Sequence, residues 1–264
     1  MARPQFSLRK HHSRPSVHAL ERRTLLAHAG SIEPSFADRG AFLQPVQPAG
    51  DFLPAERPLN LSALQADGKI VLGSSYVAGD GRQSFFLIER LGADGTPDAS
   101  FGNGGRVAIV GPGRATALVV QLDGSIIEAG SLGQGNFGAI RVLSNGTLDT
   151  SYGTQGFAIL PKTIGTTQDI QTLDSATLTA DGQLVVVGSV GDPTSPSISV
   201  EPFAARFAVG GTLDPSFGTS GVATVPITIN GLTNTTPTAV KVQPSGVVGQ
   251  FEIINFPGGH WHTI

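Results

Sequence analysis

A serine followed by an aromatic residue, with a glycine four positions later, recurs four times along this chain. The aromatic residues are Phe36, Phe101, Tyr152 and Phe217, and the glycines are Gly40, Gly105, Gly156 and Gly221. Successive aromatic residues lie 65, 51 and 65 positions apart, so the chain is one unit written about four times. A unit of this size cannot bury a core of its own, and it therefore has to stack on further copies.

Each unit contains apolar runs separated by residue pairs that favour tight turns. One hairpin turn lies at Asp67-Gly68, Asp123-Gly124 and Asp181-Gly182, and a fourth copy, Thr238–Ile254, carries Ser245-Gly246 instead. Asp-Gly pairs supply the positive φ that such turns require. The first copy has one residue fewer between this turn and the next glycine, Gly73, which predicts a bulge or a bend there.

A second hairpin in each unit leads to the aromatic residue. Its turns are Asp94-Gly95, Asn145-Gly146 and Gly210-Gly211, and the strands expected after them are Arg106–Val110, Phe157–Leu160 and Val222–Ile227. No helical apolar period is sustained, and 35 Gly and 18 Pro interrupt the chain. We therefore predict an all-β protein, a β-propeller-like array of about four four-stranded units.

The incomplete copies at the two ends are complementary. The first copy begins near Leu26 without a preceding hairpin, and the last hairpin has no aromatic copy after it. Joined, they complete a fourth unit, with a strand at Ala41–Val46 beside the C-terminal strands, which hides the edges of an open stack. The alternative is an open, truncated array, and the degenerate tail Phe251–Ile264 favours it.

Three stretches of the chain carry a family resemblance. The sequences LQADGKIVLGSS, GADGTPDASFGNGGRV and SNGTLDTSYGTQGF resemble the delta-60 repeat, a β-propeller repeat of bacterial secreted and surface proteins. The resemblance covers roughly residues 30–250. It implies a propeller scaffold and no general enzymatic activity.

The first 29 residues differ in composition from the rest of the chain. Residues 1–30 carry six Lys and Arg against one acid, and Leu25–Ala29 ends like a signal peptide, although a long apolar centre is lacking. The segment Val17–Ala27 resembles the LExRxLLA leader of bacterial surface and secreted proteins. We predict an export leader at 1–29, a repeat domain at 30–264 and a secreted or cell-surface location; a disordered basic tail is the alternative.

Charge and composition exclude several functions for the repeat domain. Residues 31–264 carry eleven Lys and Arg against nineteen acids, which argues against nucleic acid as a partner, and no apolar run is long enough to span a membrane. The chain has no Cys, and its six His residues are His11, His12, His18, His28, His260 and His262. Triads with His and His-ligated zinc are thus excluded from residues 29–259.

The repeated charged residues are interpreted as structural. An acid precedes each aromatic residue by three positions, at Glu33, Asp98, Asp149 and Asp214, and an arginine precedes three of them by eleven, at Arg90, Arg141 and Arg206. A calcium site needs several converging oxygens, whereas these acids come one per turn. We expect the acids to form turns, and the arginines to bind turn carbonyls or the acid of their own unit rather than anions.

Residues outside the repeat pattern are the better functional candidates. Glu128 occupies the position of Val186 in the next copy, and we expect it to face outward from its strand, with a channel mouth as the alternative. Glu89 is expected to be a cross-strand or surface partner. The long connections Tyr76–Ser84 and Val190–Pro202 are expected to share one face, where propellers usually bind.

Two short motifs carry no function in this interpretation. Gly133–Gly138 fits G-x-G-x-x-G, but a strand is expected to follow it where a dinucleotide site needs a helix. His260-Trp261-His262 offers two imidazoles near the chain end, which is a weak metal site.

We therefore assign no catalytic, cofactor-binding or metal-binding residue. The sequence predicts a non-enzymatic, extracellular or cell-surface repeat scaffold without a cofactor, whose ligand is an unidentified protein or carbohydrate. One alternative is a glycosidase or lyase with two carboxylates at the propeller channel. Another is a fragment of a larger surface protein.

Overall fold

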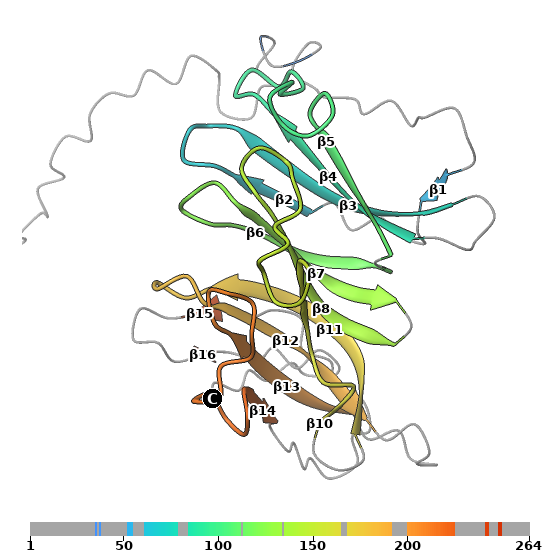
Figure 1. Cartoon of the computed structure of the whole chain (residues 1–264), viewed down its shortest axis with the longest axis vertical. Helices are drawn as coiled ribbons and strands as arrows, with labels where there is room; N and C mark the ends of the chain where they lie inside the picture. Colours follow the sequence, from blue (N-terminus) through green and yellow to red (C-terminus); the bar gives the residue numbers. More distant parts are fainter. Residues whose placement is uncertain are drawn as a thin grey trace, which may run out of the picture.

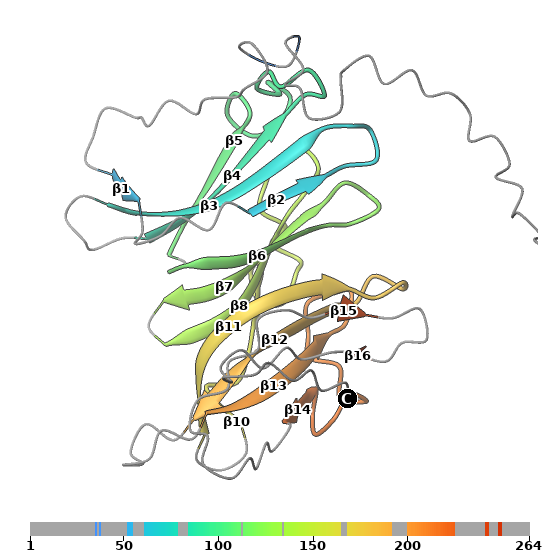
Figure 2. The ribbon, with the colours of Figure 1, turned by 180° about the vertical axis from the view of Figure 1, so that it is seen from behind.

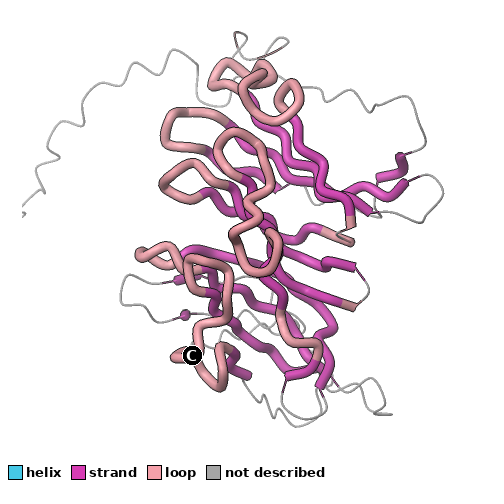
Figure 3. The backbone as a smooth tube through the Cα atoms, viewed as in Figure 1, coloured by secondary structure: helices cyan, strands magenta, loops and turns pink. Residues whose placement is uncertain are grey.

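The structure is a computed structural model of the whole chain. It describes residues 35, 37, 52–54, 61–78, 84–111, 113–133, 135–164, 168–191, 200–224, 241–242 and 248–249. These residues form strands and loops only (Figure 3). Within them, no helix has the length and apolarity needed to cross a membrane.

The described strands form three antiparallel sheets, here called sheets I, II and III, and one short hairpin. Sheet I contains β1 (Phe52–Pro54), β2 (Leu61–Leu64), β3 (Ile70–Ala78), β4 (Ser84–Leu91) and β5 (Arg106–Val110). Sheet II contains β6 (Ala115–Val120), β7 (Ile126–Gly133), β8 (Asn136–Val142) and β9 (Phe157–Ile159). Sheet III contains β10 (Thr163–Ile164), β11 (Gln168–Leu178), β12 (Leu184–Gly191), β13 (Val200–Phe207) and β14 (Val222–Thr224), and β15 (Lys241–Val242) pairs with β16 (Val248–Gly249).

Each sheet is one repeat unit. Its four main strands follow one another in the sheet in chain order, so each unit is a meander of adjacent hairpins. Figures 1 and 2 show the three sheets stacked face to face along the long axis, with β15 and β16 beside sheet III. The short strands β1 and β10 extend sheets I and III, and the sequence pattern does not predict them.

Apolar side chains fill both spaces between the sheets. Between sheets I and II, Phe86, Ile88 and Phe101 belong to one buried cluster with Ile126 and Ile140. A second cluster joins sheets II and III and includes the buried side chains of Ala129, Tyr152, Leu184, Val186 and Phe203. Because each core is built from two sheets, no unit has a complete core by itself.

The predicted four-stranded unit is confirmed. The strands predicted after the second hairpin are found at Arg106–Val110, Phe157–Ile159 and Val222–Thr224, and residues 225–227 lie outside the described residues. β15 and β16 pair with Lys241 opposite Gly249, as expected for the predicted C-terminal hairpin, and residues 243–247 lie outside the described residues. The predicted strand Ala41–Val46, and with it the closure of the ring, lies outside the described residues.

The prediction of a bulge in the first copy is wrong. Sheet I pairs Leu61 with Gly73 and Leu64 with Ile70 without a shift. Register shifts occur in the other two units, among them at Thr116 of β6 and Asp174 of β11. The position that corresponds to Gly130 and Gly188 is Ser74, so the shorter spacing changes the residue there and not the register. The bulges explain the two glycines, because each brings a backbone carbonyl against the neighbouring strand.

Replacing Gly188 with alanine is therefore expected to destabilise the fold. A Cβ at this position would lie 2.0 Å from the carbonyl oxygen of Thr172, so β11 would have to move. Overpacking of this kind typically costs about 1–3 kcal/mol of unfolding free energy. Gly210→Ala is the matched control, because nothing lies within 4 Å of a Cβ there. Urea denaturation of both variants measures the difference, and equal stabilities would contradict the steric explanation.

Candidate functional site

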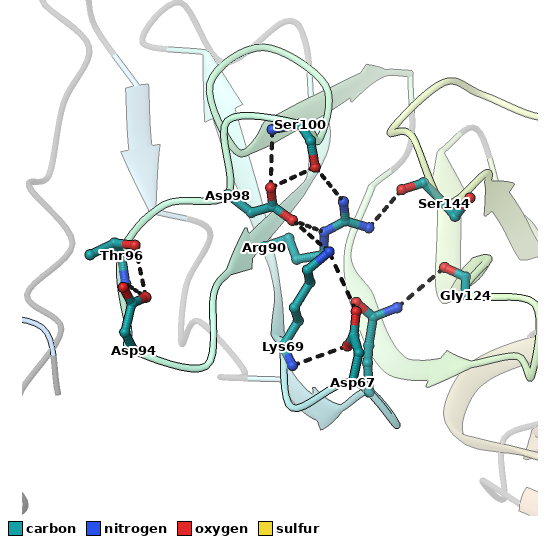
Figure 4. Close-up of polar contacts among 10 residues, drawn as sticks. Asp67, Lys69, Arg90, Asp94, Thr96, Asp98, Ser100, Gly124 and Ser144 are labelled. Atoms are coloured by element: carbon teal, nitrogen blue, oxygen red, sulfur yellow. Dashed lines mark hydrogen bonds and ion pairs between the residues drawn. The ribbon is translucent and has the colours of Figure 1, made fainter.

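The repeated arginine and aspartate of each unit form a compact polar cluster, and Figure 4 shows the cluster of sheet I. In sheet I, Arg90 Nε donates a 2.8 Å hydrogen bond to Asp98 Oδ2, and its Nη2 lies 3.3 Å from Ser100 Oγ. The guanidinium also lies over the Phe101 ring, 4.5 Å from its centroid. Asp98 Oδ1 accepts hydrogen bonds from the Ser100 hydroxyl and backbone N–H. Lys69 Nζ completes the cluster, 3.3 Å from Asp98 Oδ2.

The other two units repeat this geometry. The bonds from Arg141 Nε to Asp149 Oδ2 and from Arg206 Nε to Asp214 Oδ2 are each 2.8 Å long. The guanidinium groups lie 4.5 Å and 4.9 Å from the ring centroids of Tyr152 and Phe217. The hydroxyl of the following serine, and then its backbone N–H, lower the pKa of Asp214 to about 2, with Arg206 contributing further.

The clusters also join one unit to the next. Arg90 Nη1 donates to the carbonyl oxygen of Ser144 at 2.6 Å, and Arg141 Nη1 donates to that of Val209 at 2.8 Å. Both acceptors lie in the second hairpin turn of the following unit. Arg90 and Arg141 therefore bind both the acid of their own unit and a turn carbonyl, which confirms the structural interpretation of these two residues.

Backbone hydrogen bonds accompany the arginine contacts. The residue after each aromatic residue donates its N–H to the next turn: Gly102 to Asn145 O at 2.9 Å, and Gly153 to Gly210 O at 2.7 Å. Ala37, which follows Phe36, makes the same 2.7 Å bond to Asp94 O. These three hydrogen bonds, called inter-unit bonds below, use donors with positive φ of 53°, 58° and 46°. The N-terminal copy is thus joined to sheet I as the later units are joined to each other.

The acids of the first hairpin are turn residues, as predicted. Asp67 Oδ1 accepts the N–H of Lys69, and Asp123 Oδ1 accepts that of Ser125, two positions later in each case. Asp181 differs, because its Oδ1 accepts the Thr179 hydroxyl. Glu33 lies outside the described residues. Among the residues that the structure describes, no three His, Asp or Glu side chains are grouped so that they could hold a metal ion.

Glu128 is where the sequence interpretation fails. The side chain does not face outward but is fully buried, with 0% of its surface exposed. It lies on β7 between Leu118 and Ile140, and it points at sheet I, where Gly73 of β3 faces it. Neither carboxylate oxygen has a hydrogen-bond partner among the described residues. Burial alone raises the pKa of this carboxyl well above its ordinary value, so the neutral acid is the form that the core tolerates.

The equivalent position between sheets II and III shows how Glu128 is accommodated. There Val186 takes the place of Glu128, and Ala129 takes the place of Gly73, both within the apolar cluster. A Cβ at Gly73 would lie 2.6 Å from Glu128 Oε1 and 2.7 Å from Leu118 Cδ1. The larger side chain of Glu128 in sheet II is therefore accommodated because sheet I has a glycine, Gly73, at the facing position. This pairing of positions 73 and 128 was not visible in the sequence, since they lie 55 residues apart.

Two further non-repeated acids are Glu89 and Asp174. Glu89 lies opposite Arg106 in the β4–β5 register and forms an ion pair with it, Oε1 to Nε 2.5 Å, which confirms the cross-strand interpretation. Asp174, at the bulge of β11, was not singled out by the sequence. Burial raises its pKa, against the hydrogen bond from Thr172 and the charge of Arg114.

Tyr152 carries a buried hydroxyl that the fold does not use. Phe101 and Phe217 occupy the same position in the other units, and the Tyr152 oxygen has no hydrogen-bond partner among the described residues. Burial raises the pKa of this phenol to about 12. We expect Tyr152→Phe to leave stability unchanged or to raise it by up to about 1 kcal/mol, since it removes an unpaired buried polar group.

Thermal unfolding followed by circular dichroism measures this effect. Tyr152→Leu serves as the control, because it keeps an apolar side chain but removes the ring beneath Arg141. A Tyr152→Phe variant as destabilised as Tyr152→Leu would show that the hydroxyl has a partner.

The long connections predicted to share a face join equivalent strands. Tyr76–Ser84 links β3 to β4, and Val190–Pro202 links β12 to β13, so their anchor points lie at the same end of the sheets, opposite the Asp-Gly turns. Residues 79–83 and 192–199 lie outside the described residues, as does His260-Trp261-His262. The segment Gly133–Gly138 lies at the β7–β8 turn and is followed by a strand, which confirms that it is no dinucleotide motif.

Comparison with known proteins gives one family. Residues 65–101, 121–152 and 179–217 match the model described as "Domain of unknown function (DUF5122) beta-propeller". These units are β-propeller repeats. Each matched segment of the propeller repeat runs from the first hairpin turn to the aromatic residue, so it includes the arginine and the aspartate of the polar cluster. The match does not include Val17–Ala27, and the comparison with curated proteins found no match.

Proposed function

We propose that this propeller-repeat chain is a non-enzymatic scaffold of four units, located outside the bacterial cell or on its surface. The observation that carries the proposal is the use of the repeated charged residues within the fold. The arginines and aspartates of all three clusters are bound to each other and to turns, and the family model covers these same residues. The repeated polar residues are therefore structural, and recognition falls to the segments that differ between units.

The connections Tyr76–Ser84 and Val190–Pro202 are the proposed binding surface. They leave the sheets at one end and differ in length and sequence from the β7–β8 turn at the same end of sheet II. Variable connections on a repeated, rigid scaffold are where repeat proteins usually bind. The ligand class that fits this arrangement is a protein or a carbohydrate.

An enzyme is the less favoured function. The two acids with raised pKa, Glu128 and Asp174, lie on β7 and β11. Glu128 is completely enclosed by apolar side chains and Gly73, so it cannot reach a substrate in this conformation. Asp67 and Asp98 both contact Lys69, but the pKa of each is lowered, so neither is a candidate general acid, and we propose no catalytic residue.

Cell fractionation tests the location. The full chain with a C-terminal tag is expected in the surface or secreted fraction of a Gram-negative bacterium. Replacing Leu25 and Leu26 with aspartate is expected to abolish export, whereas the same change at Gln5 and Ser7, outside the apolar patch, is not. Retention of the unaltered chain in the cytoplasm would contradict the proposed location.

Cross-linking tests the closure of the ring. The chain has no native cysteine, so Gln44→Cys and Val248→Cys introduce the only two thiols. A short bismaleimide is expected to join them within one molecule, because a closed ring brings strand 41–46 beside the C-terminal strands. Cross-links only between molecules, at any dilution, would instead favour the fragment or polymer alternative.

A further inference from the structure

The two described junctions between sheets differ in the core that they enclose. Junction I–II lies between sheets I and II, and junction II–III lies between sheets II and III. Both are crossed by one arginine bond to a turn carbonyl and by one inter-unit bond. Junction II–III has Val186 and Ala129 in its apolar cluster, whereas junction I–II has Glu128 and Gly73 at the equivalent positions. Among the described residues, a carboxyl group is therefore enclosed in one of these two cores and not in the other.

The closed junction offers Glu128 no group that stabilises a carboxylate. The side chain is 0% exposed, and both of its oxygens lack a hydrogen-bond partner among the described residues. Its neighbours are Leu118 and Ile140 on the adjacent strands and Gly73 across the junction. An isolated carboxylate costs far more in such surroundings than the neutral acid does. The ionised form therefore needs water at this position, and the closed junction excludes it.

Charged and titratable side chains on the surrounding strands do not compensate for this burial. Arg90 faces sheet II from β4, but it is bonded to Asp98, as is Lys69 at the start of β3. Tyr76 on β3 and Arg141 on β8 lie on the faces that point away from the buried acid. Strands β2 and β6 contain no ionisable side chain. Burial is accordingly the one cause of the raised pKa of this acid.

The other described acid with a raised pKa is placed differently. Asp174 lies at the bulge of β11 and is only partly buried, and its Oδ2 accepts a 3.0 Å hydrogen bond from the Thr172 hydroxyl. The charge of Arg114 also favours its ionised form. Ionisation of Asp174 therefore does not require the sheets to separate.

Sheets I and II can separate without loss of strand pairing. Every strand ladder of the described residues lies within one sheet, and the chain passes from sheet I to sheet II once, between Val110 and Ala115. Besides the apolar cluster, single hydrogen bonds join the sheets, among them Ala115 N–H to Ser75 Oγ at 2.6 Å and Gly102 N–H to Asn145 O at 2.9 Å. Water can replace the partner of each of these groups when the junction opens.

We propose that ionisation of Glu128 opens junction I–II while junction II–III stays closed, so that the fold contains a pH-dependent opening point. In this step the carboxyl O–H bond breaks, the proton passes to water, and water entering the opened junction hydrates the carboxylate. The open form exposes the apolar surface that includes Phe86 and Ile126. The proposal depends neither on the location of the protein nor on the closure of the ring.

Proton linkage gives the direction and the steepness of this effect. In the open form the acid is hydrated and has a pKa near its ordinary value of 4.5, whereas burial raises the pKa in the closed form. Below 4.5 both forms are protonated, and opening does not depend on pH. Between the two pKa values opening releases one proton, so the opening constant rises about tenfold for each pH unit. The junction is thus closed most firmly in acid and opens more often as the pH rises.

Amide hydrogen exchange of the full chain, followed by NMR, tests the proposal. Gly102 and Ala115 donate across junction I–II, and Gly153 donates across junction II–III to Gly210 O at 2.7 Å. After correction for the intrinsic exchange rate, we expect the protection of Gly102 and Ala115 to fall about tenfold per unit between about pH 5.5 and 7.5. Gly153 should remain better protected than both over this range.

Glu128→Gln is the matched control, because it keeps the size of the side chain but has no ionisable group. In this variant the protection of Gly102 should not depend on pH. Glu128→Val gives the same comparison with an apolar side chain. Asp174→Asn removes the other acid with a raised pKa and should leave the pH dependence at Gly102 in place.

Three outcomes would overturn the proposal. Equal protection and equal pH dependence at Gly102 and Gly153 would mean that Glu128 ionises only when the whole chain unfolds. A pH dependence at Gly102 that persists in both Glu128 variants would assign the effect to another group. Protection of Gly102 that is independent of pH in the wild-type chain would mean that opening does not expose the acid.

Discussion

Glu128→Val is expected to raise the free energy of unfolding at pH 7 by about 1–3 kcal/mol, the usual cost of an unpaired buried polar group. Valine is the residue that the next unit has at this position, where it packs in the apolar cluster between sheets II and III. Glu128→Gln is the control, because it keeps the shape of the side chain but cannot ionise. Urea denaturation of the three proteins at one pH measures the order of their stabilities.

The pH dependence of this effect has a defined sign. Burial raises the pKa of Glu128 in the folded state, whereas the unfolded chain has the ordinary value near 4.5. Below that value both states are protonated, and the acid does not penalise folding through ionisation. As the pH rises from 4.5 towards the folded pKa, only the unfolded state ionises, so stability is lost. The advantage of Glu128→Gln should therefore grow from pH 4 to pH 7; an advantage that shrinks over this range would mean that the carboxylate is paired.

A double-mutant cycle tests whether Gly73 accommodates the acid. Gly73→Ala alone should destabilise the protein, since the new Cβ would lie 2.6 Å from Glu128 Oε1. In the Glu128→Val background the clash with the carboxylate is removed, but Leu118 Cδ1 remains 2.7 Å from the new Cβ, so we expect only part of the cost to disappear. Additive effects would show that the two positions are independent.

The second large effect is expected from Arg90→Ala, which should lower the unfolding free energy by about 3–5 kcal/mol, as for other broken buried ion pairs. The side chains of Arg90 and Asp98 are only 5% and 12% exposed, so the aspartate would lose a buried ion pair and keep only Lys69, 3.3 Å away, as a neighbouring cation. The variant also loses the bond to Ser144 O and the contact with the Phe101 ring. Arg90→Lys should recover part of the loss, because it keeps the charge but not the planar fork.

Arg206→Ala is the matched control for Arg90. It removes the same bond to an aspartate, but its side chain is more exposed, at 22%, and it makes no bond to a following unit among the described residues. We expect chemical denaturation to show a clearly smaller loss of unfolding free energy for Arg206→Ala than for Arg90→Ala. An equal loss would mean that the contact between units contributes little.

Lowering the pH is expected to weaken the polar clusters, whereas it removes the destabilising effect of Glu128. The Ser100 hydroxyl and backbone, followed by Lys69 and Arg90, hold the pKa of Asp98 below its ordinary value of 3.8 against the effect of burial. Stability from this carboxylate is present above pH 3.8 and is lost as the pH falls through the folded pKa. The wild-type chain should therefore be most stable at mildly acidic pH.

The repeat pattern predicted the fold because turns and spacing are local properties. Asp-Gly and Asn-Gly pairs fix hairpins, and the regular recurrence of Arg90, Asp98 and Phe101 predicted both the unit and the pairing within its cluster. The sequence also predicted that the arginines bind turn carbonyls, but it did not identify Ser144 and Val209 as the residues that provide them.

The errors concern contacts that the local sequence does not determine. The outward orientation predicted for Glu128 followed the rule that acids face solvent, and nothing near it in sequence indicates Gly73 as its neighbour. Likewise, the spacing of Gly73 suggested a defect in sheet I, whereas Gly130 and Gly188 owe their glycine to bulges in β6 and β11. Strand β1 was not predicted because it is defined by its pairing with Tyr76–Ala78, and the local sequence of β1 does not indicate this partner.

The pair of Gly73 and Glu128 has a consequence for rearranging the units. The polar clusters and the inter-unit bonds use the same groups at both junctions between the three described sheets, so these contacts alone would allow the three units to be exchanged. The core between the sheets is not interchangeable in this way. Placed behind sheet II, a copy of the second unit would set its glutamate against Ala129 instead of a glycine. An array lengthened by duplicating that unit would thus carry a steric conflict at each new junction. Duplicates of the third unit would set Val186 against Val187, the residue that takes the place of Gly73 and Ala129 in sheet III.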